Sequence, residues 1–117
     1  MALYTQLPVY QVAYELLNKC MGFVQNIPRS FKTAIGNRVR ELCVDIVLLI
    51  LRANCARDKA PHLESLLERN EELQLLLRLC QDMRFISKTQ YANAIELTAS
   101  VGRQVNGWRK HAASPVT

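Results

Sequence analysis

The chain has 117 residues, the size of one domain with a single hydrophobic core, so one domain over residues 1–117 is predicted. Half of the residues are hydrophobic and only four are glycine and four proline, which argues against both a disordered and an all-β chain. The net charge is +5, and the excess of lysine and arginine falls in residues 27–59 and 87–117, which indicates polyanions as partners. Residues 1–8 lack the basic and apolar regions of a signal peptide, so a cytoplasmic location is expected.

The first helix is predicted over residues 8–25. Pro8 suits its first turn, where a missing backbone N–H costs nothing. Apolar side chains recur at helical spacing from Val9 to Ile27, with polar ones opposite. Pro28 then breaks the chain, and Ser30 is expected to cap the next helix through its side-chain oxygen.

The second helix is predicted over residues 29–57, because no proline lies between Pro28 and Pro61. At about 100° per residue, seven apolar side chains fall on one face and form the stripe that a helix buries in a bundle. These are Phe31, Ile35, Val39, Leu42, Ile46, Leu49 and Ala53.

The same helix has a second apolar side, formed by Val44, Val47, Leu48 and Leu51. The uncharged run from Val44 to Leu51 is too short to cross a membrane, which takes about 20 residues. A helix that is apolar nearly all round is otherwise buried on more than one side. We therefore interpret this second side as an interface with another copy of the chain, and no membrane partner is expected.

Two more helices are predicted, over residues 62–84 and 88–112. In the third helix, Leu75 and Leu79 exceed what one core face needs and indicate a further part of the subunit interface. Ser87 and Gln90 have the spacing of a capping box at the start of the fourth. Four amphipathic helices joined by short turns predict an all-α, up-down-up-down four-helix bundle.

No nucleotide-binding, metalloprotease or hydrolase motif is present, so no catalytic residue, cofactor or metal is expected. The four cysteines, Cys20, Cys43, Cys55 and Cys80, form no C-x-x-C pair, and we expect free thiols packed as small hydrophobic groups, with a metal site or disulfide as the lesser alternative. Arg57 and His62 match the loose R-x(4–6)-H spacing of HEPN-type ribonucleases, which leaves a helical ribonuclease as a distant alternative.

The basic side chains are the stronger functional indication. Lysine and arginine neutralise phosphates and release counterions, which gives salt-sensitive binding that is largely independent of sequence. Any one of them has the alternative of a solvated charge or a local ion pair. The candidates for binding nucleic acid or a protein partner are Arg29, Lys32, Arg38, Arg40, Arg52, Arg57, Arg103 and Lys110.

With the bundle in place, the order of several short motifs resembles a known family. They are Asn26–Arg29 before the second helix, Phe85–Ser87 followed by Tyr91, and Val101–Trp108 in the last helix. The chain resembles the four-helix-bundle proteins that include the accessory variability determinant (Avd) of diversity-generating retroelements. A sister branch is encoded within intervening sequences of 23S ribosomal RNA genes, and residues 35–41 depart from its pattern, which favours Avd.

The resemblance implies a barrel-like homopentamer that is not a catalyst. It implies binding to the reverse transcriptase of the element and to its template RNA and cDNA, in support of mutagenic cDNA synthesis in a bacterial or phage-infected cell. Arg29 and Arg103 match motif positions, and Trp108 matches a tryptophan that we interpret as packing. A protein of the ribosomal branch that binds RNA or ribosomal components, and a plain protein-interaction adaptor, remain as alternatives.

Overall fold

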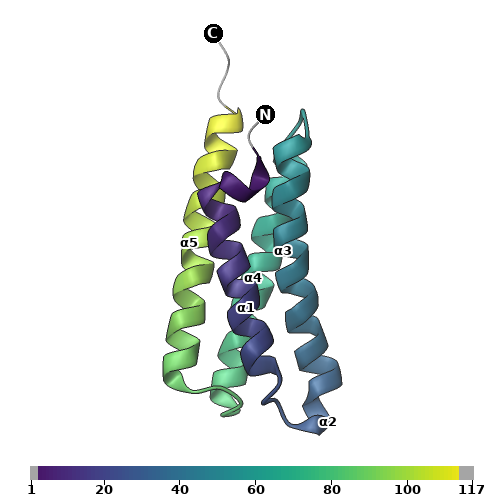
Figure 1. The fold of residues 1–117 in the computed structure, drawn as a ribbon, viewed down its shortest axis with the longest axis vertical. Coiled ribbons are helices and arrows are strands. Elements are labelled where there is room, and N and C mark those ends of the chain that lie inside the picture. The colour runs from purple at the N-terminus through teal and green to yellow at the C-terminus, as the bar shows by residue number, and fades with distance from the viewer. Residues whose placement is uncertain (1–2, 114–117) are drawn as a thin grey trace.

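The computed structural model describes residues 3–113, and the ends of the predicted domain, residues 1–2 and 114–117, lie outside the described residues. Four long helices run up and down alternately (Figure 1): α1 (Pro8–Val24), α3 (Asn37–Cys55), α4 (Ala60–Asp82) and α5 (Lys88–Ala113). Three short segments complete the chain: η1 (Tyr4–Gln6), α2 (Arg29–Phe31) and η2 (Lys32–Gly36). Residues 3–113 contain no strand, which confirms the all-helical prediction. None of the helices described is long and apolar enough to cross a membrane.

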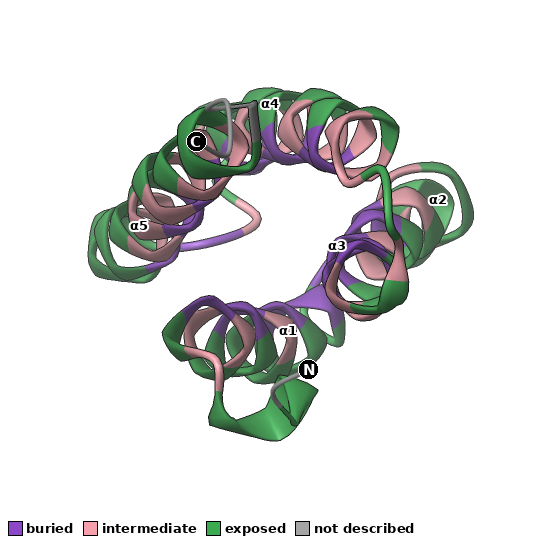
Figure 2. Ribbon diagram, turned by 90° about the horizontal axis from the view of Figure 1, so that it is seen from above, coloured by how far each residue is buried: buried purple, intermediate pink, exposed green. Residues whose placement is uncertain are grey.

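Each long helix packs against two neighbours and faces a shared core. α1 and α4 each contact α3 and α5, and α1 and α4 lie diagonally opposite one another (Figure 2). Buried residues line the inner sides of the ribbons in Figure 2, with Leu16, Ile46, Leu73 and Val101 as examples from the four helices. The core therefore consists of the apolar stripes that helical periodicity indicates.

The second helix departs from regular geometry near its start. The segment η2 is a π-helical turn, which the N–H of Asn37 closes on the carbonyl of Lys32. A π turn holds an additional residue and so rotates the preceding side chains relative to the stripe below. The prediction that Phe31 lies in the buried stripe is accordingly wrong: Phe31 is 38% exposed, and its ring contacts that of Phe85 at 5.2 Å.

A buried glycine, Gly36, ends this π turn. A Cβ atom at Gly36 would lie 3.1 Å from Cγ1 of Val24, closer than most carbon contacts. The missing side chain thus allows η2 to approach the end of α1 closely.

The helix ends differ in how their backbone groups are satisfied. At the start of α5, the N–H of Gln90 donates to Oγ of Ser87 (3.0 Å) and the N–H of Ser87 donates to Oε1 of Gln90 (2.8 Å), which confirms the capping box. The predicted cap at Ser30 is wrong, because the helix already begins at Arg29 and no side chain caps it. At the end of α3, Nζ of Lys59 donates to three carbonyls of the last turn and the residue beyond it.

We predict that Ser87→Ala lowers the free energy of unfolding by about 1 kcal/mol, because a backbone N–H loses its acceptor. Ser30→Ala is the matched control and should change it by less than about 0.5 kcal/mol. Urea denaturation followed by circular dichroism measures both. Equal effects of the two substitutions would contradict this account of the caps.

Candidate nucleic-acid and protein interfaces

Charge is unevenly divided among the four long helices. α4 carries five acidic and two basic side chains, whereas α5 carries four basic and one acidic. α1 carries only Glu15 and Lys19. Because α1 lies diagonally opposite α4, the face that α1 shares with α3 and α5 is the side away from the acidic groups of α4, which are five of the ten in the chain.

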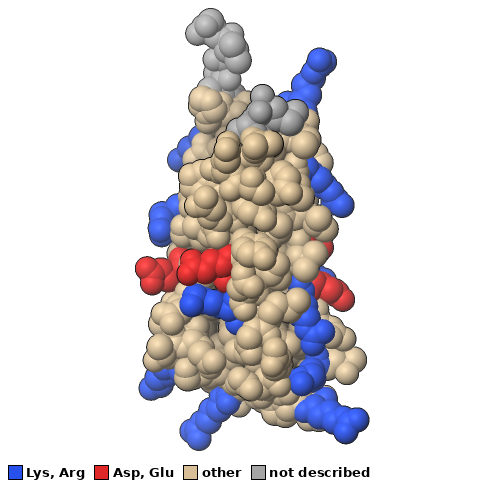
Figure 3. Space-filling view, in the orientation of Figure 1, with Lys and Arg blue, Asp and Glu red and all other residues tan. Residues whose placement is uncertain are grey.

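Figure 3 shows this face, with α1 toward the viewer. Lysine and arginine side chains follow both edges and the lower end, and the acidic side chains are confined to a band across the middle. Between the edges the surface is largely uncharged. The basic groups therefore flank this face, above and below the charged band across its middle.

The structure distributes the predicted basic residues along the whole bundle, whose longest dimension is 53 Å. Arg29 and Lys32 lie at the end of the bundle that holds α2. The opposite end holds Arg52, Arg57 and Lys110. Between the two ends lie Arg38, Arg40 and Arg103. The residues therefore do not form one compact patch on a single chain.

Arg38 differs from the other candidates because it is held in an ion pair. Its Nε and Nη2 donate to the two carboxylate oxygens of Glu72 at 2.6 and 2.7 Å, and its Nη1 donates to Glu41 at 3.3 Å. The hydrogen bond with Glu72 raises the pKa of Arg38, and Arg38 in turn lowers the pKa of Glu72. Together with the contact between Arg69 and Asp45 at 3.6 Å, this pair ties α3 to α4.

Sequence reasoning missed this pair, because its partners are 34 residues apart. The sign of the charges on the two helices was the only indication, since α4 is acidic and the start of the second helix is basic. Arg38 thus has a structural role in holding α3 against α4. Its neighbour Arg40 is half-buried, and no such ion pair is described for it.

Two apolar patches remain on the outside of the bundle. The α3 patch consists of Val44, Val47, Leu48 and Leu51, of which Val44 and Leu48 are 39% and 38% exposed and the other two half-buried. The α4 patch consists of Leu75, Leu79 and Met83, which are 67%, 38% and 39% exposed. Sequence reasoning found both patches but did not include Met83.

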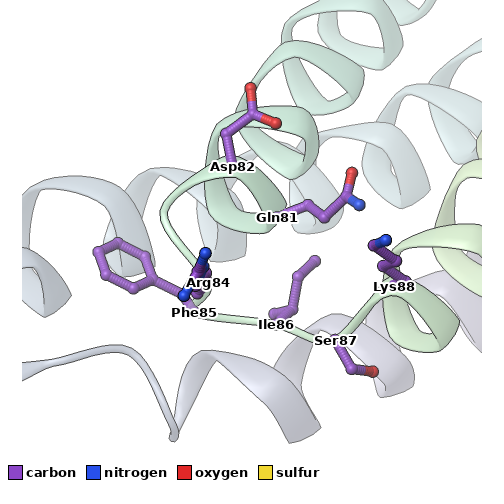
Figure 4. A pocket seen from close by; sticks show the side chains of 7 residues that line it. All are labelled: Gln81, Asp82, Arg84, Phe85, Ile86, Ser87 and Lys88. Atoms are coloured by element: carbon purple, nitrogen blue, oxygen red, sulfur yellow. The ribbon is translucent and has the colours of Figure 1, made fainter.

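A hollow of about 690 Å³ lies at the turn between α4 and α5 (Figure 4). In the view of Figure 4, Gln81 lies above Ile86 and Lys88 to its right, and Phe85 points away from them. The hydroxyl of Ser87 is occupied as the acceptor of the capping box. The lining thus mixes charged, polar and apolar side chains from the end of α4, the turn and the start of α5.

All four cysteines are free thiols, as predicted. Cys20, Cys43 and Cys80 are buried in the core, as expected, whereas Cys55 is exposed at the end of α3, so the prediction that it packs as a small hydrophobic group is wrong. A hydrogen bond with Cys43, and burial, raise the pKa of the Cys20 thiol, and burial raises the pKa of Cys80. Because metals and electrophiles react with the thiolate, these buried groups are poorly suited to both. Within residues 3–113 no cluster of three or more histidine, cysteine or acidic residues is arranged to hold a metal ion.

Arg57 and His62 lie on different parts of the junction between α3 and α4. Arg57 is exposed in the turn, and His62 is half-buried in the first turn of α4, next to Pro61. They therefore project from a turn and a helix rather than from one helical surface.

Residues 3–113 thus form a four-helix bundle with basic side chains along the edges of one face and two exposed apolar patches. The sequence profile of a family described as bAvd-like matches residues 7–112. The chain belongs to this family, which confirms the resemblance to Avd proteins. None of the curated proteins matches the chain.

The pair of Arg38 and Glu72 gives a pH-dependent prediction. Because the pKa of Glu72 lies below its ordinary 4.5 in the folded protein, its contribution to stability is present above pH 4.5 and is lost as the pH falls through the folded pKa. We expect Glu72→Gln to destabilise the protein at neutral pH, with a difference from wild type that closes in acid.

Chemical denaturation across the pH range measures this difference. Glu71→Gln, at the exposed neighbouring position, is the control and should show a smaller difference. A difference for Glu72→Gln that persists unchanged in acid would show that the ion pair is not its source.

Proposed function

We propose that this protein is a non-catalytic accessory protein of a diversity-generating retroelement, acting in the cytoplasm of a bacterial or phage-infected cell. It binds the reverse transcriptase of the element together with its template RNA and cDNA, and it supports mutagenic cDNA synthesis. Membership of the bAvd-like family is the observation that carries this proposal. The net charge of +5 and the basic edges in Figure 3 support it.

The proposed mechanism is electrostatic and structural. Basic side chains at both ends and on α5 hold the phosphate backbone, while another surface docks the polymerase. Phosphate contacts position a nucleic acid without discriminating between bases, so little sequence specificity is expected from them. Arg103 is the most informative of these residues, because it is exposed on α5 and stands at a motif position.

We further propose that the protein assembles with copies of itself through its two apolar patches. The patches lie on different helices, so the α3 patch of one copy would meet the α4 patch of the next. Such a heterologous interface repeats until it closes into a ring, and the family resemblance implies five subunits. The acidic residues of α4 and the exposed Arg52 of α3 give the two sides opposite charges, which supports this arrangement.

For nucleic-acid binding, we predict that Arg103→Ala lowers the affinity for RNA several-fold. It should also reduce the slope of log affinity against log salt by about 0.7 to 0.9 for each phosphate that the variant no longer neutralises. Arg78→Ala is the matched control, because Arg78 lies on α4 and pairs with Asp82 at 3.3 Å. Filter binding at several salt concentrations measures both. Tight binding that salt does not weaken would contradict the electrostatic mechanism.

For assembly, we predict that Leu48→Glu dissociates the oligomer, because it places a charge in the α3 patch. Ala99→Glu adds the same charge at an exposed position on α5 and should leave the oligomer intact. Light scattering coupled to gel filtration gives the mass of each variant. If Leu48→Glu keeps the mass of the wild type, the α3 patch is not the interface.

A further inference from the structure

Three tyrosine rings form a continuous row on the outside of the bundle. The rings of Tyr4 and Tyr10 meet edge to face, with their centroids 5.3 Å apart. The rings of Tyr10 and Tyr14 stack, with their centroids 5.9 Å apart and an angle of 19° between their planes. Tyr10 and Tyr14 are one helical turn apart on α1, and η1 brings Tyr4 back onto them. We call these three residues the tyrosine ladder.

The ladder leaves much of its aromatic surface open to solvent. Tyr4 and Tyr14 are 41% and 49% exposed, and only Tyr10, which is half-buried, packs against the core. Two rings of the ladder therefore contribute little to the core. Large aromatic groups that stay exposed side by side mark an interaction surface more often than isolated ones do.

The surroundings of the ladder indicate which partner it fits. Tyr10 and Tyr14 lie on α1, which has only Glu15 and Lys19 as charged residues, and Tyr4 lies on η1, which has none. Lysine and arginine side chains line the edges of the face in Figure 3, and α4, with its five acidic residues, lies on the opposite side. Aromatic rings between basic edges match a partner molecule that has planar apolar groups along its middle and negative charges along its outer sides.

We propose that the tyrosine ladder is a stacking surface for the unpaired bases of a single-stranded nucleic acid, whose phosphates contact the flanking basic side chains. This inference rests on the proposed function, in which the protein binds nucleic acid. It adds that the bound strand is single, and that the tyrosine ladder distinguishes it from a duplex. Every base has a π face, so stacking on tyrosine tolerates any sequence. A duplex keeps its bases stacked inside and offers the ladder nothing beyond its phosphates.

The favoured strand is one that is transiently unpaired, such as a template in front of a polymerase or a newly made cDNA. A docked protein or a second copy of the chain would also cover the tyrosines. Either would require acidic groups to face the basic edges, whereas the phosphates of a single strand supply that charge by themselves. For this reason we commit to the nucleic acid and make the other occupants outcomes of the test.

The test compares the double variants Tyr4→Leu/Tyr14→Leu and Tyr4→Phe/Tyr14→Phe. Leucine keeps the exposed apolar character and removes the aromatic face, whereas phenylalanine keeps the face and removes only the hydroxyl. Both positions are exposed, so both variants should fold, which thermal melting checks. The probes are fluorescein-labelled oligo(dT), which forms no base pairs with itself, and a DNA duplex of the same length, followed by fluorescence anisotropy.

We expect the leucine variant to bind oligo(dT) at least about tenfold more weakly than the wild type, because each base stacked on an aromatic side chain contributes about fivefold or more and the variant removes two rings. Its affinity for the duplex and the salt dependence of binding should be unchanged. The phenylalanine variant should bind both probes as the wild type does. Gel filtration should give all three proteins the same mass.

Four results would overturn the proposal. Unchanged binding of oligo(dT) by the leucine variant removes the ladder while leaving the proposed function standing, as does an equal loss for both probes. A leucine variant with an altered mass assigns the tyrosines to contacts between copies of the chain. A wild-type protein that binds neither probe overturns the nucleic-acid part of the proposed function, and this inference with it.

Discussion

The structure depends on one constraint, the burial of the inner stripe of α3. Leu42 and Ile46 are completely buried, and they can leave water only if α1 and α4 pack on either side of α3 and α5 closes the ring of helices. The π turn and Gly36 adjust the start of this helix to the end of α1, and the ion pairs of Arg38 and Arg69 fix it against α4. The α3 patch, with Val44 and Leu48, remains on the outside of the bundle.

The surface divides into regions of different character because charge and apolar groups are separated on it. The α4 side combines acidic residues with Leu75 and Leu79, which suits a protein neighbour, and above all another copy of the chain. The α1 side combines exposed tyrosines with basic edges, which suits a nucleic acid. A single small bundle would in this way hold polymerase, nucleic acid and its own copies on separate faces.

Much of the fold could be predicted from the sequence, because helical periodicity and the capping box of Ser87 depend on residues close together in the chain. The π turn could not, since it arises from the fit of Gly36 against α1, and this is why Phe31 was misplaced. The candidate site was predictable only in part. Composition and helical spacing identified the basic residues and the α3 patch. The pairing of Arg38 with Glu72 and the tyrosine ladder depend instead on contacts between elements.

The central claim is that this protein accompanies a retroelement reverse transcriptase. The most direct test is to purify the tagged protein from its native host and to identify the proteins and RNA that come with it, before and after nuclease treatment. The account predicts one reverse transcriptase that survives the nuclease, together with one structured RNA that does not. Ribosomal RNA or ribosomal proteins in their place would contradict it and move the protein to the ribosomal branch of the family.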